Sequence, residues 1–342
     1  MEVWLREIYP RLRGANEVTL LTWNTPGETK LFEGLYGVAT QSIPDLGRGG
    51  LPPLRGAMEF YSRCVSADLV YCVDSHVQAI RLSSLFEKLS LTPFILGHHS
   101  PSDWVNEWVF PWIRRTHVLK WFSAHHVLNR ESKRYLEQIG AKNVNLIPNG
   151  VTLKNYGLSP KQDTFTILFV GRLVKLKGVD LIPILVNQLL KRVPVFRFDI
   201  VGKGPLEYLF LNNNRVNYLG FVSDELKRLL YQRSHVLVMP SRMETFSLVG
   251  LEAMASGTPV VASDIPGPRE YVRDGFNGYL VRDVKEMAER VCEVYTAWRR
   301  GDPSYYELCR NARRTAEEYD WGRVVPRLER MFREVARGAT SK

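Results

Sequence analysis

Short apolar runs alternate with longer amphipathic segments along the chain from Val18 onward. In the first half the apolar runs are EVTLLTW, DLVYCV, TPFILGHH, HHVLN and NVNLIP. Strands spaced in this way, with helical stretches between them, are typical of a parallel sheet with crossover helices. The first half is therefore predicted to be an α/β domain.

The alternation stops at Ile147–Val151 and then begins again. The segment IPNGV interrupts the pattern, and a polar stretch follows it to about Asp163. Later strand candidates are TFTILFVG, VFRFDIVG, VNYLGF, HVLVMP and PVVAS, separated by helical segments such as VDLIPILVNQLLKR and DELKRLLYQ. We therefore predict two Rossmann-like, doubly wound domains with parallel sheets, residues 1–150 and 151–303.

The last segment, residues 304–342, is predicted to be helical and is strongly charged. The pattern leaves two readings open, an ordinary packing helix and a helix that crosses back onto the first domain. Its apolar residues with near one-face spacing are Trp321, Val324, Val325, Leu328 and Phe332.

The formal charge is +10, from 46 basic and 36 acidic side chains, which suggests an anionic ligand such as a diphosphate, a nucleic acid or a lipid headgroup. The basic residues are scattered and no binding motif accompanies them, which argues against nucleic acid. The four cysteines show no C-x-x-C pair, so neither a disulfide framework nor a zinc site is expected. We find neither a membrane-spanning run nor a signal-peptide layout, and we expect a cytoplasmic protein.

The stretch PSRMETFSLVGLEAMASGTPVVASD, residues 240–264, joins an apolar strand to a helix that Gly257 can terminate. In an open α/β sheet, such a strand-to-helix turn is where ligands bind. The first N–H groups of a helix lack intrahelical partners and suit a diphosphate. The residues expected around this helix start are Thr245, Phe246, Ser247, Leu248 and Val249.

Glu244 and Glu252 lie in the same stretch, eight positions apart. If the first lies in the loop and the second two turns into the helix, one ligand could touch both. Carboxylates accept hydrogen bonds from hydroxyl groups, which suggests a sugar at one and a ribose at the other.

A basic turn follows another apolar strand in FVGRLVKLKG, residues 169–178. Arg172 can offer a planar fork to phosphate oxygens, and Lys177 can offer a point charge beside it. Together they could stabilise a departing nucleoside diphosphate.

These stretches resemble retaining glycosyltransferases of the GT-B fold, family 4 in particular, also described as glycosyl transferases group 1. The stretch at 240–264 matches the family's E-x(7)-E element and the run that follows it, and the turn at 169–178 looks like its phosphate-binding Arg and Lys. Three shorter segments fall in the family's order: IPNGV at 147–151, VGKGP at 201–205 and LGFV at 219–222.

The resemblance implies two domains facing a cleft and a retaining hexosyltransferase that uses a nucleotide sugar, a UDP or GDP derivative, and a hydroxyl acceptor. No metal or other cofactor is implied. His98 in the segment GHHS is the implied histidine contact to the donor sugar, with His99 as the alternative. Catalytic roles are implied for Glu244, Arg172, Lys177 and His98, and donor binding, besides the helix start, for Gly171, Gly202, Phe221, Val222 and Glu252.

One departure from the family pattern concerns the N-terminus. Family members open with a strand and a glycine-rich turn, whereas Met1 here leads almost directly into the expected first helix. Without this strand and loop, the sequence does not decide whether the protein binds an acceptor and turns over. A partner or subunit could complete the sheet. A non-catalytic sugar-nucleotide-binding subunit and a sugar-nucleotide epimerase of the same fold remain as alternatives.

Trp104, Trp108 and Trp112 recur every four residues and precede Arg114 and Arg115. Aromatic side chains beside basic ones are typical of an interfacial membrane segment. Packing inside the first domain or against another subunit is the other reading. The pattern leaves open a lipid-linked acceptor and peripheral contact with the inner face of the membrane.

Overall fold

The computed structural model describes residues 7–12, 17, 20–22, 40–42, 54–73, 83, 85–89, 92–99, 118–211 and 213–340. The chain divides into two compact units. Unit 1 comprises Met1–Pro148 and Trp321–Lys342, and unit 2 comprises Asn149–Asp320. Each unit is built on parallel strands with helices, which confirms the predicted α/β class.

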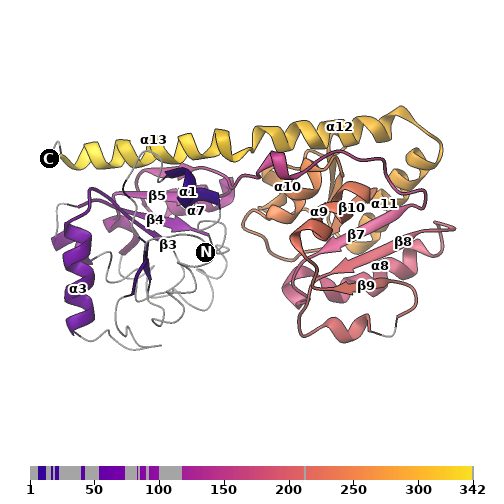
Figure 1. Ribbon diagram of the computed structural model, residues 1–342, viewed down its shortest axis with the longest axis horizontal. Helices are drawn as coiled ribbons and strands as arrows, with labels where there is room; N and C mark the ends of the chain where they lie inside the picture. Colours follow the sequence, from indigo (N-terminus) through magenta and orange to yellow (C-terminus); the bar gives the residue numbers. More distant parts are fainter. Residues whose placement is uncertain are drawn as a thin grey trace. The chain divides into compact units, whose positions relative to one another are not determined.

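Unit 2 holds a six-stranded parallel sheet in the order β12-β11-β10-β7-β8-β9 (Figure 1). The chain order reverses between β7 and β10, which pair directly. An open α/β sheet binds ligands at such a switch point, outside the carboxyl ends of its strands. The strands are β7 (Thr166–Val170), β8 (Arg197–Val201), β9 (Asn217–Gly220), β10 (Val236–Met239), β11 (Val260–Ser263) and β12 (Gly278–Val281).

Helices cover the two faces of this sheet because its central strands are apolar on both sides. Alternate residues of β7, Ile167 and Phe169, pack in one cluster with Leu185 of α8 and Val291 of α11. The α-helices are α8 (Ile182–Leu189), α9 (Asp224–Arg233), α10 (Leu248–Ala255), α11 (Val284–Arg299) and α12 (Pro303–Glu318). The 3₁₀ turns are η3 (Leu153–Asn155), η4 (Lys175–Lys177), η5 (Val179–Leu181), η6 (Glu207–Leu209) and η7 (Pro268–Glu270).

The end of α10 follows the sequence prediction. Gly257 has a φ of 66° and donates its N–H to the Met254 carbonyl at 2.9 Å. The N–H of Thr258 donates to the Ala253 carbonyl at 3.0 Å. This pair of bonds is a Schellman motif, which satisfies carbonyls that the helix end would otherwise leave unpaired.

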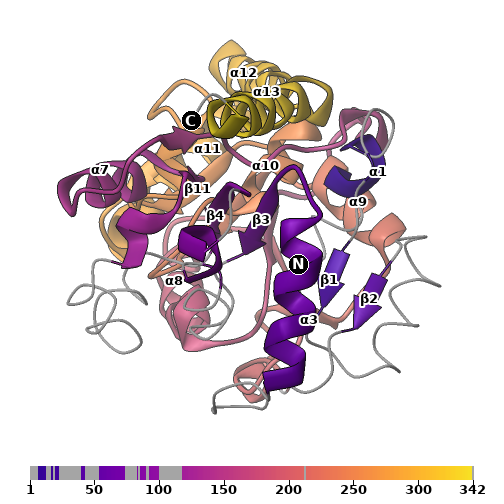
Figure 2. The same ribbon diagram turned by 90° about the vertical axis from the view of Figure 1, so that its left-hand side faces the viewer.

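Unit 1 holds a four-stranded parallel sheet in the order β3-β4-β5-β6 and a separate parallel pair, β1 and β2 (Figure 2). Residues 1–6, which bear on the expectation of a missing first strand, and the tryptophans at 104, 108 and 112 lie outside the described residues. The strands are β1 (Leu20–Thr22), β2 (Thr40–Ser42), β3 (Val70–Val73), β4 (Phe94–His98), β5 (Ala124–Val127) and β6 (Val144–Leu146). The helices are α1 (Tyr9–Leu12), α3 (Leu54–Val65), η2 (Val118–Trp121), α7 (Arg130–Gln138) and α13 (Trp321–Thr340).

The charged C-terminal segment forms two helices that belong to different units: α12 lies in unit 2 and α13 in unit 1. The apolar stripe of α13 packs on the unit 1 sheet, against Ile95 of β4 and Ala124 of β5. The residues of this stripe include Trp321, Val324, Val325, Leu328, Met331 and Phe332.

Candidate functional site

Two loops of unit 2 meet at the switch point, one after β7 and one after β10. Lys177 ends η4, and its Nζ donates to Oε1 of Glu244 at 2.6 Å. The Ser241 hydroxyl donates to the same oxygen at 2.9 Å. The Glu244 side chain is only 9% exposed, so its carboxylate depends on these two donors in place of water. The structure therefore brings Lys177 and Glu244 together, and Ser241 is a partner that the sequence reading missed.

The turn that carries Lys177 is fastened to the loop after β10. The Arg242 guanidinium bonds both carboxylate oxygens of Asp180 at 2.7 Å, and these hydrogen bonds lower the pKa of Asp180. Gly178 has a φ of 67°, and a Cβ on it would lie 1.8 Å from the Pro240 carbonyl oxygen. Only glycine allows both the φ and the close approach, so the backbone itself sets the position of Lys177.

Arg172 lies at an exposed position directly after β7. In the part of the chain that the structure describes, its guanidinium has no ion-pair partner. Beside it, a Cβ on Gly202, whose φ is 136°, would lie 1.9 Å from the Gly171 carbonyl oxygen. The Gly202 N–H donates to the Gly220 carbonyl at 2.7 Å. Glycines thus draw the ends of β7, β8 and β9 together and keep bulky side chains away from this edge.

The helix after β10 begins later than the sequence suggested. It starts at Leu248, so Thr245 and Phe246 precede it. Both are buried, and the Phe246 ring packs against Tyr271 with a centroid distance of 5.4 Å. Ser247 is the residue before the helix, so the unpaired N–H groups belong to it and to the residues that follow, Val249 included.

Ser247 adopts an unusual backbone conformation, with φ 72° and ψ 97°. Non-glycine residues at positive φ cost of order 1–3 kcal/mol and cluster at ligand-binding sites. The Tyr271 hydroxyl donates to the Ser247 carbonyl at 3.1 Å, and burial raises the pKa of Tyr271 so that it keeps its proton. Tyr271 therefore holds the strained residue in place.

Glu252 is the fifth residue of α10, so it lies little more than one turn into the helix and not two as expected. Its Oε2 accepts a hydrogen bond from the Tyr231 hydroxyl at 2.9 Å and lies 3.6 Å from Nζ of Lys227. The pKa of Tyr156 is raised, mainly by burial and then by the nearby charge of Glu252. The sequence reading missed these three neighbours of Glu252 because they come from distant segments.

Phe221 and Val222 form the short link between β9 and α9. The Phe221 side chain is 79% exposed, while Val222 is half-buried. An aromatic face that is this exposed can stack on a flat ring of a ligand. Ser223 then caps α9, with its hydroxyl accepting from the Leu226 N–H at 3.3 Å.

The two histidines at the end of β4 lie in unit 1 in different surroundings. His98 is buried, and its Nε2 lies 3.0 Å from Nδ1 of His125, whose Nε2 lies 2.9 Å from the Leu119 carbonyl. Because a carbonyl only accepts, a neutral His125 accepts at Nδ1 and His98 donates. His99 is half-buried, and its Nε2 lies 2.9 Å from the Tyr71 hydroxyl. Neither geometry tests the predicted sugar contact.

Histidine burial predicts a pH dependence for the stability of unit 1. Burial is the main cause that lowers the pKa of His125 and of His126 to about 4, from 6.5. Between these values the unfolded chain binds more protons, so stability is complete above pH 6.5 and is lost as the pH falls towards 4. We expect the free energy of unfolding of His126→Gln, measured with urea, to fall less steeply than that of wild type between pH 6.5 and 5, by roughly 1 kcal/mol per pH unit. Equal slopes would contradict this.

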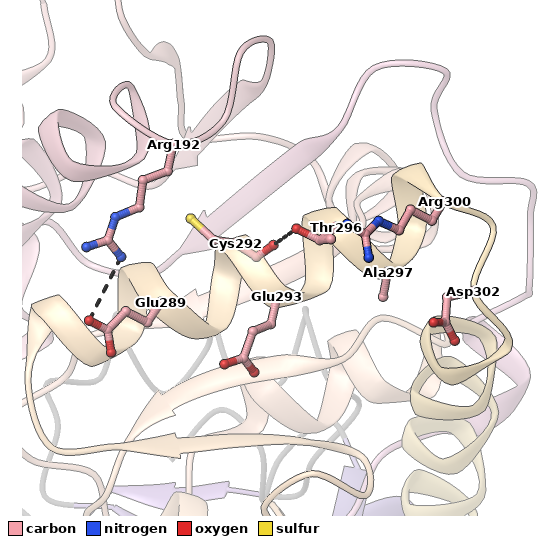
Figure 3. Close-up of a pocket in the computed structure, with 8 residues that line it drawn as sticks. All are labelled: Arg192, Glu289, Cys292, Glu293, Thr296, Ala297, Arg300 and Asp302. Atoms are coloured by element: carbon pink, nitrogen blue, oxygen red, sulfur yellow. Dashed lines mark hydrogen bonds and ion pairs between the residues drawn. The ribbon is translucent and has the colours of Figure 1, made fainter.

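A surface pocket of about 470 Å³ in unit 2 is lined mainly by α11 (Figure 3). Arg192 approaches Glu289 at 3.9 Å across it. Since no candidate residue lines this pocket, we do not assign it to the switch-point site. Its lining residues are Arg192, Glu289, Cys292, Glu293, Thr296, Ala297, Arg300 and Asp302.

The described part of the chain contains neither a cluster of metal ligands nor a membrane-spanning helix. No three His, Cys, Asp or Glu residues of that part gather closely enough to hold a metal ion. None of its helices combines the length and apolar character needed to cross a bilayer. Two aromatic residues that follow the tryptophans at 104, 108 and 112 in the sequence lie in unit 1: Phe122 is buried, and the Lys88 ammonium lies 3.6 Å from the ring centroid of Trp121.

Known proteins share the fold and part of the sequence. Residues 164–297 match the family model described as Glycosyl transferases group 1, a range that contains Arg172, Lys177, Glu244 and Glu252. Anabaena HepE in complex with UDP superimposes with a TM-score of 0.81 at 20% identity, over 97% of this chain and 96% of that chain. The chain resembles the group 1 glycosyltransferases and has the GT-B fold. The resemblance to glycosyl transferases group 1 that the sequence motifs indicated is confirmed.

Three further proteins are similar to this chain. Sucrose-phosphate synthase from Thermosynechococcus elongatus superimposes with a TM-score of 0.71 at 18% identity, over 97% of this chain and 91% of that chain. An uncharacterized glycosyltransferase of Methanocaldococcus jannaschii is 31% identical over 183 residues, 51% of this chain and 46% of its own length. The D-inositol 3-phosphate glycosyltransferase of Geodermatophilus obscurus is 31% identical over 226 residues, 58% of this chain and 49% of its own length. The chain thus spans about half the length of these curated relatives.

Proposed function

We propose that this protein transfers a hexosyl unit from a nucleoside diphosphate sugar to a hydroxyl acceptor, with retention at the anomeric carbon. The observation that carries the proposal is the Lys177–Glu244 pair at the switch point of unit 2, in the loops that precede α8 and α10. The group 1 family match over residues 164–297 supports it.

Each site residue has a distinct role in this proposal. The Arg172 fork, the Lys177 ammonium and the unpaired N–H groups at the start of α10 stabilise negative charge that develops on the departing diphosphate. Glu244 accepts a hydrogen bond from a sugar hydroxyl. Retention follows if the acceptor attacks from the face that the diphosphate leaves, with the diphosphate as base. No metal takes part in this scheme, and the sugar contact of His98 stays a prediction.

The donor nucleotide is proposed to contact Phe221, Val222 and Glu252. The exposed Phe221 ring and the backbone of Val222 serve the base, and Glu252 accepts from the ribose hydroxyls. HepE structures are described as complexes with UDP and with UDP-glucose, so UDP sugars are the first donors to test. GDP sugars are the second.

Glu252→Ala is expected to weaken donor binding by about tenfold or more, because a hydrogen bond to a charged acceptor contributes roughly 1.5 to 3 kcal/mol. Calorimetric titration with the tightest-binding UDP or GDP sugar measures this. Glu225→Ala, which removes a glutamate 78% exposed on α9, is the matched control and should bind as wild type does. Unchanged affinity in a folded Glu252→Ala variant would overturn the assignment.

A lipid-linked acceptor is proposed for the reaction, with peripheral contact between unit 1 and an anionic membrane. Relatives named phosphatidyl-myo-inositol mannosyltransferase, from Mycobacterium tuberculosis, and phosphatidylinositol N-acetylglucosaminyltransferase gpi3 subunit, from Schizosaccharomyces pombe, support this. They are 29% and 26% identical over 59% of this chain. The aromatic and basic residues at 104–115 add the sequence argument.

We expect wild type to co-sediment with anionic liposomes at low salt and much less with neutral ones. The triple variant Trp108→Ala, Arg114→Ala, Arg115→Ala should lose most of this binding. A wild-type protein that stays in the supernatant with both vesicle types would favour a soluble acceptor.

A further inference from the structure

The carboxylate of Glu252 is approached from one face of α9 by two side chains that differ in character. Lys227 and Tyr231 are four residues apart on this helix, so they lie one above the other. The Tyr231 hydroxyl donates to Oε2 at 2.9 Å, whereas the Lys227 ammonium lies 3.6 Å from the same oxygen. The second distance is within ion-pair range but too long for a hydrogen bond, so the ammonium is beside the carboxylate without being fully engaged by it.

Tyr231 and Lys227 differ in how deeply their side chains are buried. Tyr231 is fully buried, and burial raises its pKa, so its hydroxyl stays protonated and donates to the Glu252 carboxylate. Lys227 and Glu252 have partly open side chains, 25% and 18% exposed. Asp224 Oδ1 also lies 3.3 Å from the Lys227 ammonium. With three N–H donors, the ammonium can still donate to an incoming hydroxyl while it stays near both carboxylates.

The position of Lys227 follows from the turn before α9. Its N–H donates to the Ser223 carbonyl at 2.9 Å, and Ser223 comes directly after the Phe221–Val222 segment. In a nucleotide the ribose is bonded directly to the base. If the base lies on Phe221 and Val222, the ribose therefore lies beside the first turn of α9, where Lys227 and Glu252 meet.

We propose that Lys227 and Glu252 together recognise the two ribose hydroxyls of the donor nucleotide. Lys227 acts as the hydrogen-bond donor and Glu252 as the acceptor, and Tyr231 is the positioning residue of Glu252. This inference rests on the proposed function. Glu252 accepts the hydrogen of one hydroxyl, and Lys227 donates to the oxygen of its neighbour. A deoxyribose lacks one of these hydroxyls, so either Lys227 or Glu252 would lose its hydrogen bond to the ligand. A site built to bond both hydroxyls therefore binds the deoxyribonucleotide much more weakly than the ribonucleotide. Lys227 is thus a specificity-determining residue for ribonucleotides.

The test measures dissociation constants by calorimetry. UDP, GDP and ADP are titrated into wild type, and the tightest binder is then compared with its 2′-deoxy and 3′-deoxy analogues. Wild type is expected to prefer the ribonucleotide to each deoxy form by about tenfold or more. In Lys227→Met, we expect the ratio of dissociation constants between one deoxy analogue and the ribonucleotide to fall to near unity. The ratio for the other analogue, which lacks the hydroxyl that Glu252 binds, should remain.

Two further variants test whether the effect of Lys227 comes from a specific contact with the ribose rather than from a change of charge or of folding stability. Arg228→Met removes the same charge from the neighbouring residue, which pairs with Glu225 at 3.2 Å, and should keep both preferences. Tyr231→Phe should weaken ribonucleotide binding and raise the KM of the donor with little change in kcat, a split that mere loss of folding stability would not produce.

The outcomes distinguish the two proposals. If Lys227→Met weakens the binding of the ribonucleotide and of both deoxy analogues by the same factor, or leaves all three affinities unchanged, the role proposed for Lys227 is wrong and the proposed function stands. If none of the three nucleoside diphosphates binds wild type, the proposed function is wrong and this inference falls with it.

Discussion

Lys177→Ala is expected to lower turnover by about 10²- to 10³-fold, with a smaller change in donor affinity. Lys177 is held at the switch point by Glu244 at 2.6 Å, in a loop whose backbone cannot easily move. A positive charge in that position stabilises the diphosphate more as it departs than before, so its loss should appear in kcat. Steady-state kinetics with a saturating nucleotide sugar measure the effect, and Arg172→Ala should shift in the same direction.

Lys175→Ala is the matched control for this measurement. Lys175 begins the same 3₁₀ turn and is exposed, so the control removes an equal charge from the same loop. We expect it to keep nearly full turnover. If Lys177→Ala raised only the KM, the lysine would hold the ground state of the donor and would not act on the leaving group.

Gly178→Ala is expected to destabilise unit 2 by about 3 kcal/mol or more. An added Cβ would sit 1.8 Å from the Pro240 carbonyl oxygen, so the two loops of the site would have to separate. The positive φ adds its own cost of roughly 1–2 kcal/mol for a residue other than glycine. Urea unfolding monitored by circular dichroism gives the free energy of unfolding.

Gly275→Ala isolates the cost of the backbone conformation. Gly275 has a φ of 69°, close to that of Gly178, but a Cβ there would meet nothing within 4 Å. It should lose only about 1–2 kcal/mol. Equal losses in the two variants would mean that the contact between Gly178 and Pro240 does not set the position of the loop.

Local patterns in the sequence were enough to predict five of the six strands of unit 2 and the two turns that carry its candidate residues. Continuous apolar runs mark strands buried on both faces, such as β7 and β10, and the polar turns that follow them carry Lys177 and Glu244. Because parallel strands end at one edge, residues that follow them are brought together. Gly257 ends α10 for a reason that is also local.

What the sequence did not reveal depends on contacts between distant segments. Strand β12, Gly278–Val281, is only half-buried over its central residues and has no long apolar run. The late start of α10 follows from the burial of Phe246 against Tyr271 and from the strained Ser247, none of which local propensity encodes. Tyr231 reaches Glu252 from another helix, and only the packing of the fold shows that contact.

The anomeric configuration of the released sugar tests the central claim most directly. Wild type is incubated with an α-linked UDP or GDP sugar and water as the acceptor, and proton NMR follows the first product before mutarotation. The account predicts that the α-anomer appears first, and that Lys177→Ala produces it far more slowly than Lys175→Ala does. Release of the β-anomer first would contradict a retaining transferase.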